Sequence, residues 1–198
     1  GKDRTNAVAA ALIASPQEVP GLVYWARAEG PDFTNGAKVD AWSDLSGFGN
    51  HATQAVVSAQ PAFVTNAVNG RPALRFTKSS AQQLFLPTAG FNGLTSLRGV
   101  TVMAVCRWGG QVTSGLFGAW GGAANSHFEI TSAAGQLRLR IAALNSAYGT
   151  NAMTPGAWCQ VAGVMRGAGD SPTASLYRDG ERKGELSADP GAALLSGY

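Results

Sequence analysis

The side chains that could carry out catalysis are few and stand apart along the chain. The Asp and Glu residues nowhere show the E-x-D-x-x-E spacing that holds two carboxylates about 5 Å apart on one strand for glycoside hydrolysis. Serine and histidine do not fall into the context of a catalytic triad, and a Q-x-H strand typical of alginate-type lyases is missing. There are two histidines and two cysteines, without a C-x-x-C pair, so no structural zinc site is expected. The sequence favours a protein that is not an enzyme.

One group of polar residues could still form a site. Residues 126–131 and 136–141 alternate apolar and polar, as half-buried strands do. If the two strands are neighbours, their outward side chains share one face of a sheet. Those side chains are His127, Glu129, Arg138 and Arg140. They could bind a ligand, or they could simply form a solvated face.

Aromatic residues near strand ends suggest carbohydrate binding. A sugar needs flat apolar area with polar groups at its edge, which aromatic side chains provide. Such residues, with one amide, are Trp108, Trp120, Tyr148 and Asn151. Each could instead pack into the core or into its own loop.

The densest run of turn-forming residues is W-S-D-L-S-G-F-G-N-H-A-T-Q, residues 42–54. Asp and Asn bond nearby backbone groups, and Gly allows positive φ. Asp44, Asn50 and the carbonyls of 46–49 also offer the oxygen ligands that calcium accepts, although calcium needs about six to eight of them. The alternatives are a calcium site and a loop in which Asp44 and Asn50 bond only the backbone.

Short strands separated by turn signals must position these residues. The expected strands are 21–26, 62–64, 73–76, 84–86, 99–108, 116–120, 126–131, 136–141, 158–166, 174–178 and 181–186. Segment 99–108 is apolar on both faces, as in a strand covered on both sides. The sequence predicts an all-β protein, an antiparallel β-sandwich, with residues 1–20 as a short N-terminal helix or arm that ends at Pro16 and Pro20.

Several motifs resemble a known family. The run from Trp42, Q-P-x-F from Gln60 and N-G-R-P-A-L-R-F from Asn69 resemble the laminin-G-like, concanavalin-A-like jelly-roll domains of bacterial surface proteins and phage virion proteins. G-A-W-C-Q-V-A from Gly156 and S-L-Y-R-D-G from Ser175 resemble later strands of that family. The resemblance implies a jelly roll over residues 21–198. It constrains function less, because this fold carries many functions.

The resemblance also bears on the cysteines and on the last strands. Pentraxins, distant relatives on this fold, have a cross-strand disulfide at the positions of Met103 and Ala162. The same register places Cys106 opposite Cys159, where the two could form a disulfide or stay buried free thiols. Family members usually continue with further strands after a hairpin like 174–186. We therefore expect a fragment, or a sheet that a partner completes by strand addition.

Composition limits the classes of partner that the chain could bind. Only 14% of residues are charged and the net charge is +3, without a Lys/Arg run, which argues against nucleic acid. No apolar run reaches the ~18 residues of a membrane span. We expect a non-enzymatic recognition or adhesion module on an extracellular or virion surface that binds carbohydrate, with calcium as the one cofactor considered. The alternative is a structural phage virion protein, a capsid-decoration or tail component, that uses the sandwich for protein–protein contacts within an oligomeric assembly.

Overall fold

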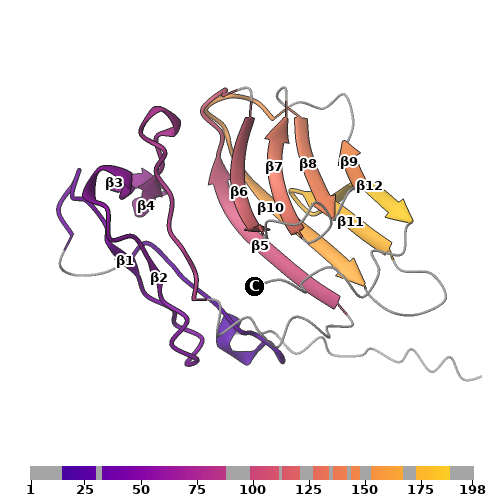
Figure 1. Cartoon of the computed structure of the whole chain (residues 1–198), viewed down its shortest axis with the longest axis horizontal. Helices are drawn as coiled ribbons and strands as arrows, with labels where there is room; N and C mark the ends of the chain where they lie inside the picture. Colours follow the sequence, from indigo (N-terminus) through magenta and orange to yellow (C-terminus); the bar gives the residue numbers. More distant parts are fainter. Residues whose placement is uncertain are drawn as a thin grey trace, which may run out of the picture. The chain divides into compact units, whose positions relative to one another are not determined.

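A computed structural model of the chain describes residues 15–29, 33–87, 99–111, 113–120, 127–133, 136–141, 144–147, 153–166 and 173–187. Within them, every pair of strands is antiparallel and the only helices are short 3₁₀ turns (Figure 1). The predicted all-β character is confirmed. The contacts divide the chain into two compact units, Gly1–Gly90 and Phe91–Tyr198. The prediction of one sandwich domain over 21–198 stays a prediction.

The N-terminal unit holds two small sheets. β1 (Ala41–Trp42) pairs with β2 (Ala52–Thr53), and β3 (Ala62–Val68) pairs with β4 (Arg71–Arg75). The 3₁₀ turns are η1 (Pro16–Glu18), η2 (Val57–Ala59) and η3 (Lys78–Ser80). Most of the predicted N-terminal helix or arm lies outside the described residues. Asn69 and Gly70 turn the β3–β4 hairpin with φ of 48° and 77°, the left-handed conformation that an Asn-Gly turn adopts.

Two predicted strands of this unit are wrong. Residues 21–26 belong to no sheet, because their backbone groups bond the loop after β1 instead of a neighbouring strand. Residues 84–86 make a single bridge, in which Phe85 and Thr53 exchange two backbone hydrogen bonds of 2.8 Å. In both segments, the backbone hydrogen bonds are made without a ladder of paired strands.

The C-terminal unit holds two four-stranded sheets. The β10 sheet has the order β12-β11-β10-β5, with β5 (Gly99–Arg107), β10 (Trp158–Arg166), β11 (Thr173–Arg178) and β12 (Glu181–Ser187). The β7 sheet has the order β6-β7-β8-β9, with β6 (Thr113–Trp120), β7 (His127–Ala133), β8 (Gln136–Ile141) and β9 (Leu144–Ala147). The strands predicted over these segments are confirmed, most closely β8 and β10.

The core of this unit lies between the two sheets. Ile130 and Leu139 of the β7 sheet and Val161 and Leu176 of the β10 sheet are fully buried in one cluster. At Gly163 of β10, an added Cβ would lie 2.9 Å from the Ile130 Cδ1 atom, so the sheets approach closely there. Two sheets packed face to face give the unit a sandwich-like character.

The alternation along β5 differs from the prediction. Val100, Val102 and Cys106 pack against the core. Met103 and Val105, on the other face, are 63% and 64% exposed. β5 is therefore not covered on both faces as predicted. It is an edge strand of its sheet.

Candidate functional site

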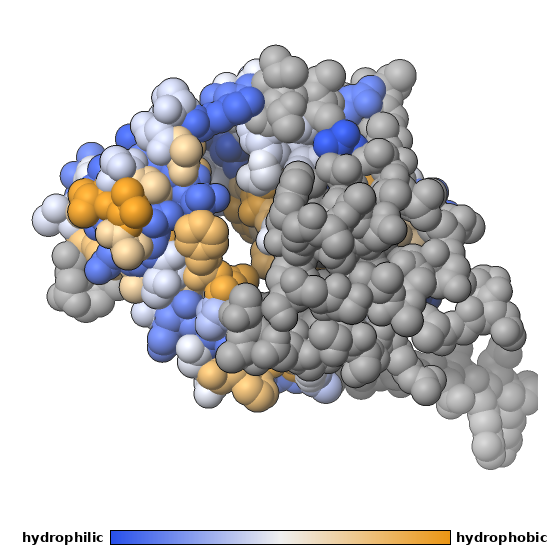
Figure 2. Space-filling model, viewed as in Figure 1, coloured by the Kyte–Doolittle hydropathy of each residue, from blue (hydrophilic) through white to orange (hydrophobic). Residues whose placement is uncertain are grey.

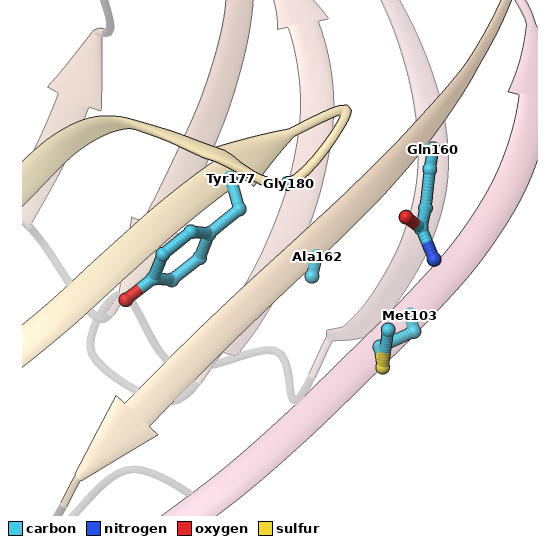
Figure 3. A pocket seen from close by; sticks show the side chains of 5 residues that line it. All are labelled: Met103, Gln160, Ala162, Tyr177 and Gly180. Atoms are coloured by element: carbon cyan, nitrogen blue, oxygen red, sulfur yellow. The ribbon is translucent and has the colours of Figure 1, made fainter.

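A hollow on the outer face of the β10 sheet is a candidate binding site. The strand register places Tyr177 of β11 opposite Ala162 of β10, and Ala162 opposite Met103 of β5. These residues form one row across three strands. The hollow has a volume of about 190 Å³ and is lined by Met103, Gln160, Ala162, Tyr177 and Gly180 (Figure 3).

Strand alternation and one turn put these side chains together. Val161 and Met165 of β10 face the core, so Gln160 and Ala162 point outward. The Asp179–Gly180 turn, with φ of 52° and 81°, joins β11 to β12 next to Gln160 of β10. Gln160 donates its backbone N–H to Asp179 Oδ1 (2.9 Å) and accepts from the Asp179 N–H (2.9 Å), which fixes this end of the hollow.

The lining combines apolar area with polar groups. Figure 3 shows the Tyr177 ring on one side of Ala162, with Gln160 and Met103 on the other. A flat ring, a thioether and a methyl group offer apolar contact, and the Gln160 amide can both donate and accept hydrogen bonds. The lining contains no carboxylate, histidine or cysteine. Its chemistry suits binding rather than bond breaking.

Charged groups of β12 border this row. Arg182 stands opposite Tyr177 in the register, and Glu185 stands opposite Ser175. Arg182 and Glu185 form an ion pair, and the Ser175 hydroxyl lies 3.4 Å from Glu185. A ligand lying along the row from Met103 towards β12 would meet apolar surface first and then hydrogen-bonding groups.

The two cysteines occupy the opposite face of the sheet. Cys106 and Cys159 are register partners, as predicted, with their Sγ atoms 3.9 Å apart as free thiols. The disulfide between them stays a prediction. Burial first, and then the neighbouring Cys159, raise the pKa of Cys106 to about 12. Burial likewise raises the pKa of Cys159. Neither thiol is therefore a ready nucleophile.

The residues predicted from strand alternation are partly brought together. β7 and β8 are neighbours, with Glu129 opposite Arg140 and Thr131 opposite Arg138. Arg138 Nε donates to Thr131 Oγ1 at 3.3 Å. His127 stands opposite Trp120 in the backbone register. The side chains of Trp120, His127, Glu129 and Arg140 lie outside the described residues.

The other predicted aromatic residues do not gather at the hollow. Trp108 packs partly against the core, and its indole N–H donates to the Gln111 carbonyl at 3.0 Å. This contact favours a packing role for Trp108. Tyr148 and Asn151 lie outside the described residues. On the N-terminal unit, small apolar patches stand between hydrophilic ones (Figure 2). Its exposed large apolar residues are Val19, Phe48, Val56, Val57, Phe76 and Phe85.

Asp44 is the centre of the loop after β1. Its Oδ1 accepts from the N–H groups of Trp25 (3.0 Å) and Ser46 (2.9 Å). Its Oδ2 accepts from the Asn50 N–H (2.9 Å) and the Ser46 hydroxyl (2.7 Å). The Asn50 amide donates to the Val23 carbonyl at 2.7 Å. The loop thus ties the extended segment around Trp25 to the rest of the unit, as the backbone-shaping interpretation predicts.

The electrostatics of Asp44 follow from these contacts. Burial acts to raise the pKa of its carboxyl group, but the hydrogen bonds from Trp25, Ser46 and Asn50 outweigh burial and lower that pKa below its ordinary value. Nearby, burial first and then the Asp44 charge raise the pKa of Tyr24 to about 12. The carboxylate is therefore ionised at neutral pH and held by neutral donors.

These residues fit a calcium ion poorly. A carboxylate has about four acceptor positions, and protein donors use four at Asp44. The part of the chain that the structure describes also contains no group of three or more His, Cys, Asp or Glu side chains arranged for a metal. Calcium binding at Asp44 and Asn50 stays a prediction, and no step of the proposed function depends on it.

Sequence reasoning missed Met103, Gln160 and Tyr177 as site residues. A signal was available, because alternation in β10 already places Gln160 on the outer face and the β5–β10 register places Met103 near it. The apolar run 99–108 hid this signal, since it suggested a strand covered on both sides.

Comparisons with known proteins assign no family to the chain. No family model matches it, and no curated protein matches it significantly. No helix in the described ranges is long and apolar enough to cross a membrane.

Proposed function

We propose that the chain is a non-enzymatic recognition module of the laminin-G-like, concanavalin-A-like jelly-roll type. It binds carbohydrate on an extracellular or virion surface through the outer face of the β10 sheet. The observation that carries the proposal is the hollow between Met103, Gln160 and Tyr177, where an aromatic ring and an amide flank an apolar floor. This pairing matches a sugar ring, which has an apolar C–H face and a hydroxyl edge.

The size of the hollow favours a single sugar unit. Its volume of about 190 Å³ is below the ~300 Å³ at which drug-sized pockets begin. One ring would rest against Tyr177, and the next unit of a glycan would extend towards Arg182 and Glu185 on β12. Such a shallow site suits extended surface polysaccharides rather than enclosed small molecules.

A glycan array tests this function. The full chain should bind a restricted set of glycans. Tyr177→Ala should reduce that binding about tenfold, because an aromatic contact of this kind is worth about 1.4 kcal/mol, which is a factor of ten in affinity. Phe48→Ala is the matched control, since Phe48 is 69% exposed on the other unit and should leave binding unchanged. The absence of binding to any glycan would remove the proposal.

A structural virion protein is the second candidate. The exposed Met103 and Val105 side chains favour it, because isolated domains rarely leave neighbouring apolar residues uncovered on a strand at the edge of a sheet. Mass spectrometry of gradient-purified particles should then find the chain in stoichiometric amounts. Glycan binding by a chain that is missing from particles would favour the first proposal.

A further inference from the structure

The backbone hydrogen bonds of β10 determine which residues of β5 face the open edge of the sheet. Gln160 directs both its N–H and its C=O towards β11, where they meet Asp179. Successive residues of a strand direct these groups to opposite sides, so Val161 and the odd-numbered residues of β10 point to β5. Val161 stands opposite Ala104. The even-numbered residues of β5 therefore bond β10.

The odd-numbered residues of β5 consequently face away from the sheet. Thr101, Met103 and Val105 direct their N–H and C=O groups to the outer side of β5, and no other described strand pairs with it. The side chains of these three residues are also exposed. Unpaired backbone groups and exposed side chains thus coincide along one strand.

The two edges of this sheet differ in chemistry. The β12 edge carries the charged residues Glu181, Arg182, Lys183 and Glu185, and its pairing with β11 shifts register between Leu176 and Tyr177. Charges and irregular register are the devices that protect an edge from pairing with another chain. β5 has no charged residue before Arg107, no proline, and a continuous register with β10.

We propose that β5 is a homodimer interface, in which it pairs antiparallel with β5 of a second copy about a two-fold axis at Met103. Met103 is the midpoint of Gly99–Arg107, so this register uses the whole strand. It places Thr101 opposite the partner's Val105, a β-branched pair, and Met103 opposite its own copy. Arg107 then faces the partner's Gly99, and no like charges meet.

The sequence of β5 is suited to pairing with a second copy of itself. An isologous contact requires one patch to be self-complementary, and β5 meets that requirement without any charge to neutralise. The result is one continuous eight-stranded sheet from two β10 sheets. The two-fold axis stands perpendicular to it, so the hollows beside Met103 and the partner's Met103 lie on the same face. The proposal goes beyond carbohydrate binding and does not depend on it.

Charge substitution at the self-facing residue tests the register. Met103→Lys and Met103→Glu each place two like charges opposite one another in the dimer, which is destabilising for a cross-strand pair. Each variant alone should sediment as a monomer, at 20.3 kDa, whereas the wild-type chain should sediment at about twice that mass. An equimolar mixture of the two should restore the dimer, because Lys then faces Glu.

Controls on the opposite edge match the change in net charge. Glu181→Gln and Arg182→Gln alter the charge by the same amounts on β12 and should leave the dimer intact. Circular dichroism of every variant checks the fold. Substitutions of Met103 should leave the fold unchanged, because its side chain is 63% exposed. Independently of any variant, the Met103 amide should exchange with deuterium more slowly as protein concentration rises. A wild-type monomer at all concentrations, or a mixture that stays monomeric, would overturn the proposal.

Discussion

Replacing Asp44 by asparagine should destabilise the N-terminal unit by about 2–4 kcal/mol. Through Oδ1, asparagine can keep the bonds from the Trp25 and Ser46 N–H groups. In place of Oδ2 it presents an NH₂ group to the Asn50 N–H, which is then an unpaired buried donor. That donor costs about 1–3 kcal/mol, and each of the two retained bonds loses about 0.5 kcal/mol with the charge.

The same substitution should change the response to acid. The pKa of Asp44 is lowered in the folded state, below the ~3.9 of an unfolded chain. Its contribution is therefore complete above pH ~4 and is lost as pH falls through the folded pKa. The wild-type chain should lose stability over that interval, and D44N should lose less because it has no carboxylate to protonate.

Urea unfolding followed by tryptophan fluorescence measures both effects, since Trp25 and Trp42 lie in this unit. The control is Asp40→Asn, the same chemical change at an exposed side chain, which should stay within about 0.5 kcal/mol of wild type. Calcium or a chelator should not move the wild-type midpoint, because protein donors already use the carboxylate. Equal stability of D44N and D40N, or a calcium-dependent midpoint that D44N abolishes, would refute this reasoning.

Three further predictions concern the C-terminal unit. Gly163→Ala should lower the free energy of unfolding by about 1–3 kcal/mol, because its Cβ would crowd Ile130 and Leu139. Gly115→Ala is the control, because a Cβ there meets nothing within 4 Å. Equal losses of stability in the two variants would contradict the packing explanation. With its pKa at about 12, Cys106 should react with iodoacetamide at pH 8 on the order of 100–1000 times more slowly in the folded chain than in urea. Diamide should oxidise Cys106 and Cys159 to a disulfide within one chain, which lowers the mass of the chain; Cys159→Ser should prevent that loss of mass. Formation of a disulfide between two chains instead would contradict the 3.9 Å approach of the two Sγ atoms.

Local sequence signals predicted the strands of the C-terminal unit well. Alternation in 136–141 predicted β8, the turn signal before residue 158 predicted β10, and the turn at Asp179-Gly180 predicted the last hairpin. The register of Cys106 with Cys159 has a different origin, because the resemblance to pentraxins implied it and no pattern within either strand shows it. For the strands and the hairpin, the signal lies within the element itself or at its ends.

The errors arose where partners are distant in sequence. Residues around Trp25 have the composition of a strand, but their bonding groups are taken by Asp44 and Asn50 some twenty residues later. The hollow is formed by a row of residues on three strands, and no single sequence motif predicts such a row. Met103 and Val105 looked like core residues because apolar composition alone does not show which strand lies at an edge.

The most direct test of carbohydrate recognition is a titration followed through the methionine methyl groups. The chain has three methionines, and Met165 is only 4% exposed in the core, whereas Met103 lines the hollow. With ¹³C-methyl labelling, a glycan that binds the chain should shift the Met103 signal in a saturable way and leave Met165 unmoved. A bound glycan that leaves the Met103 signal unchanged would contradict the proposed site.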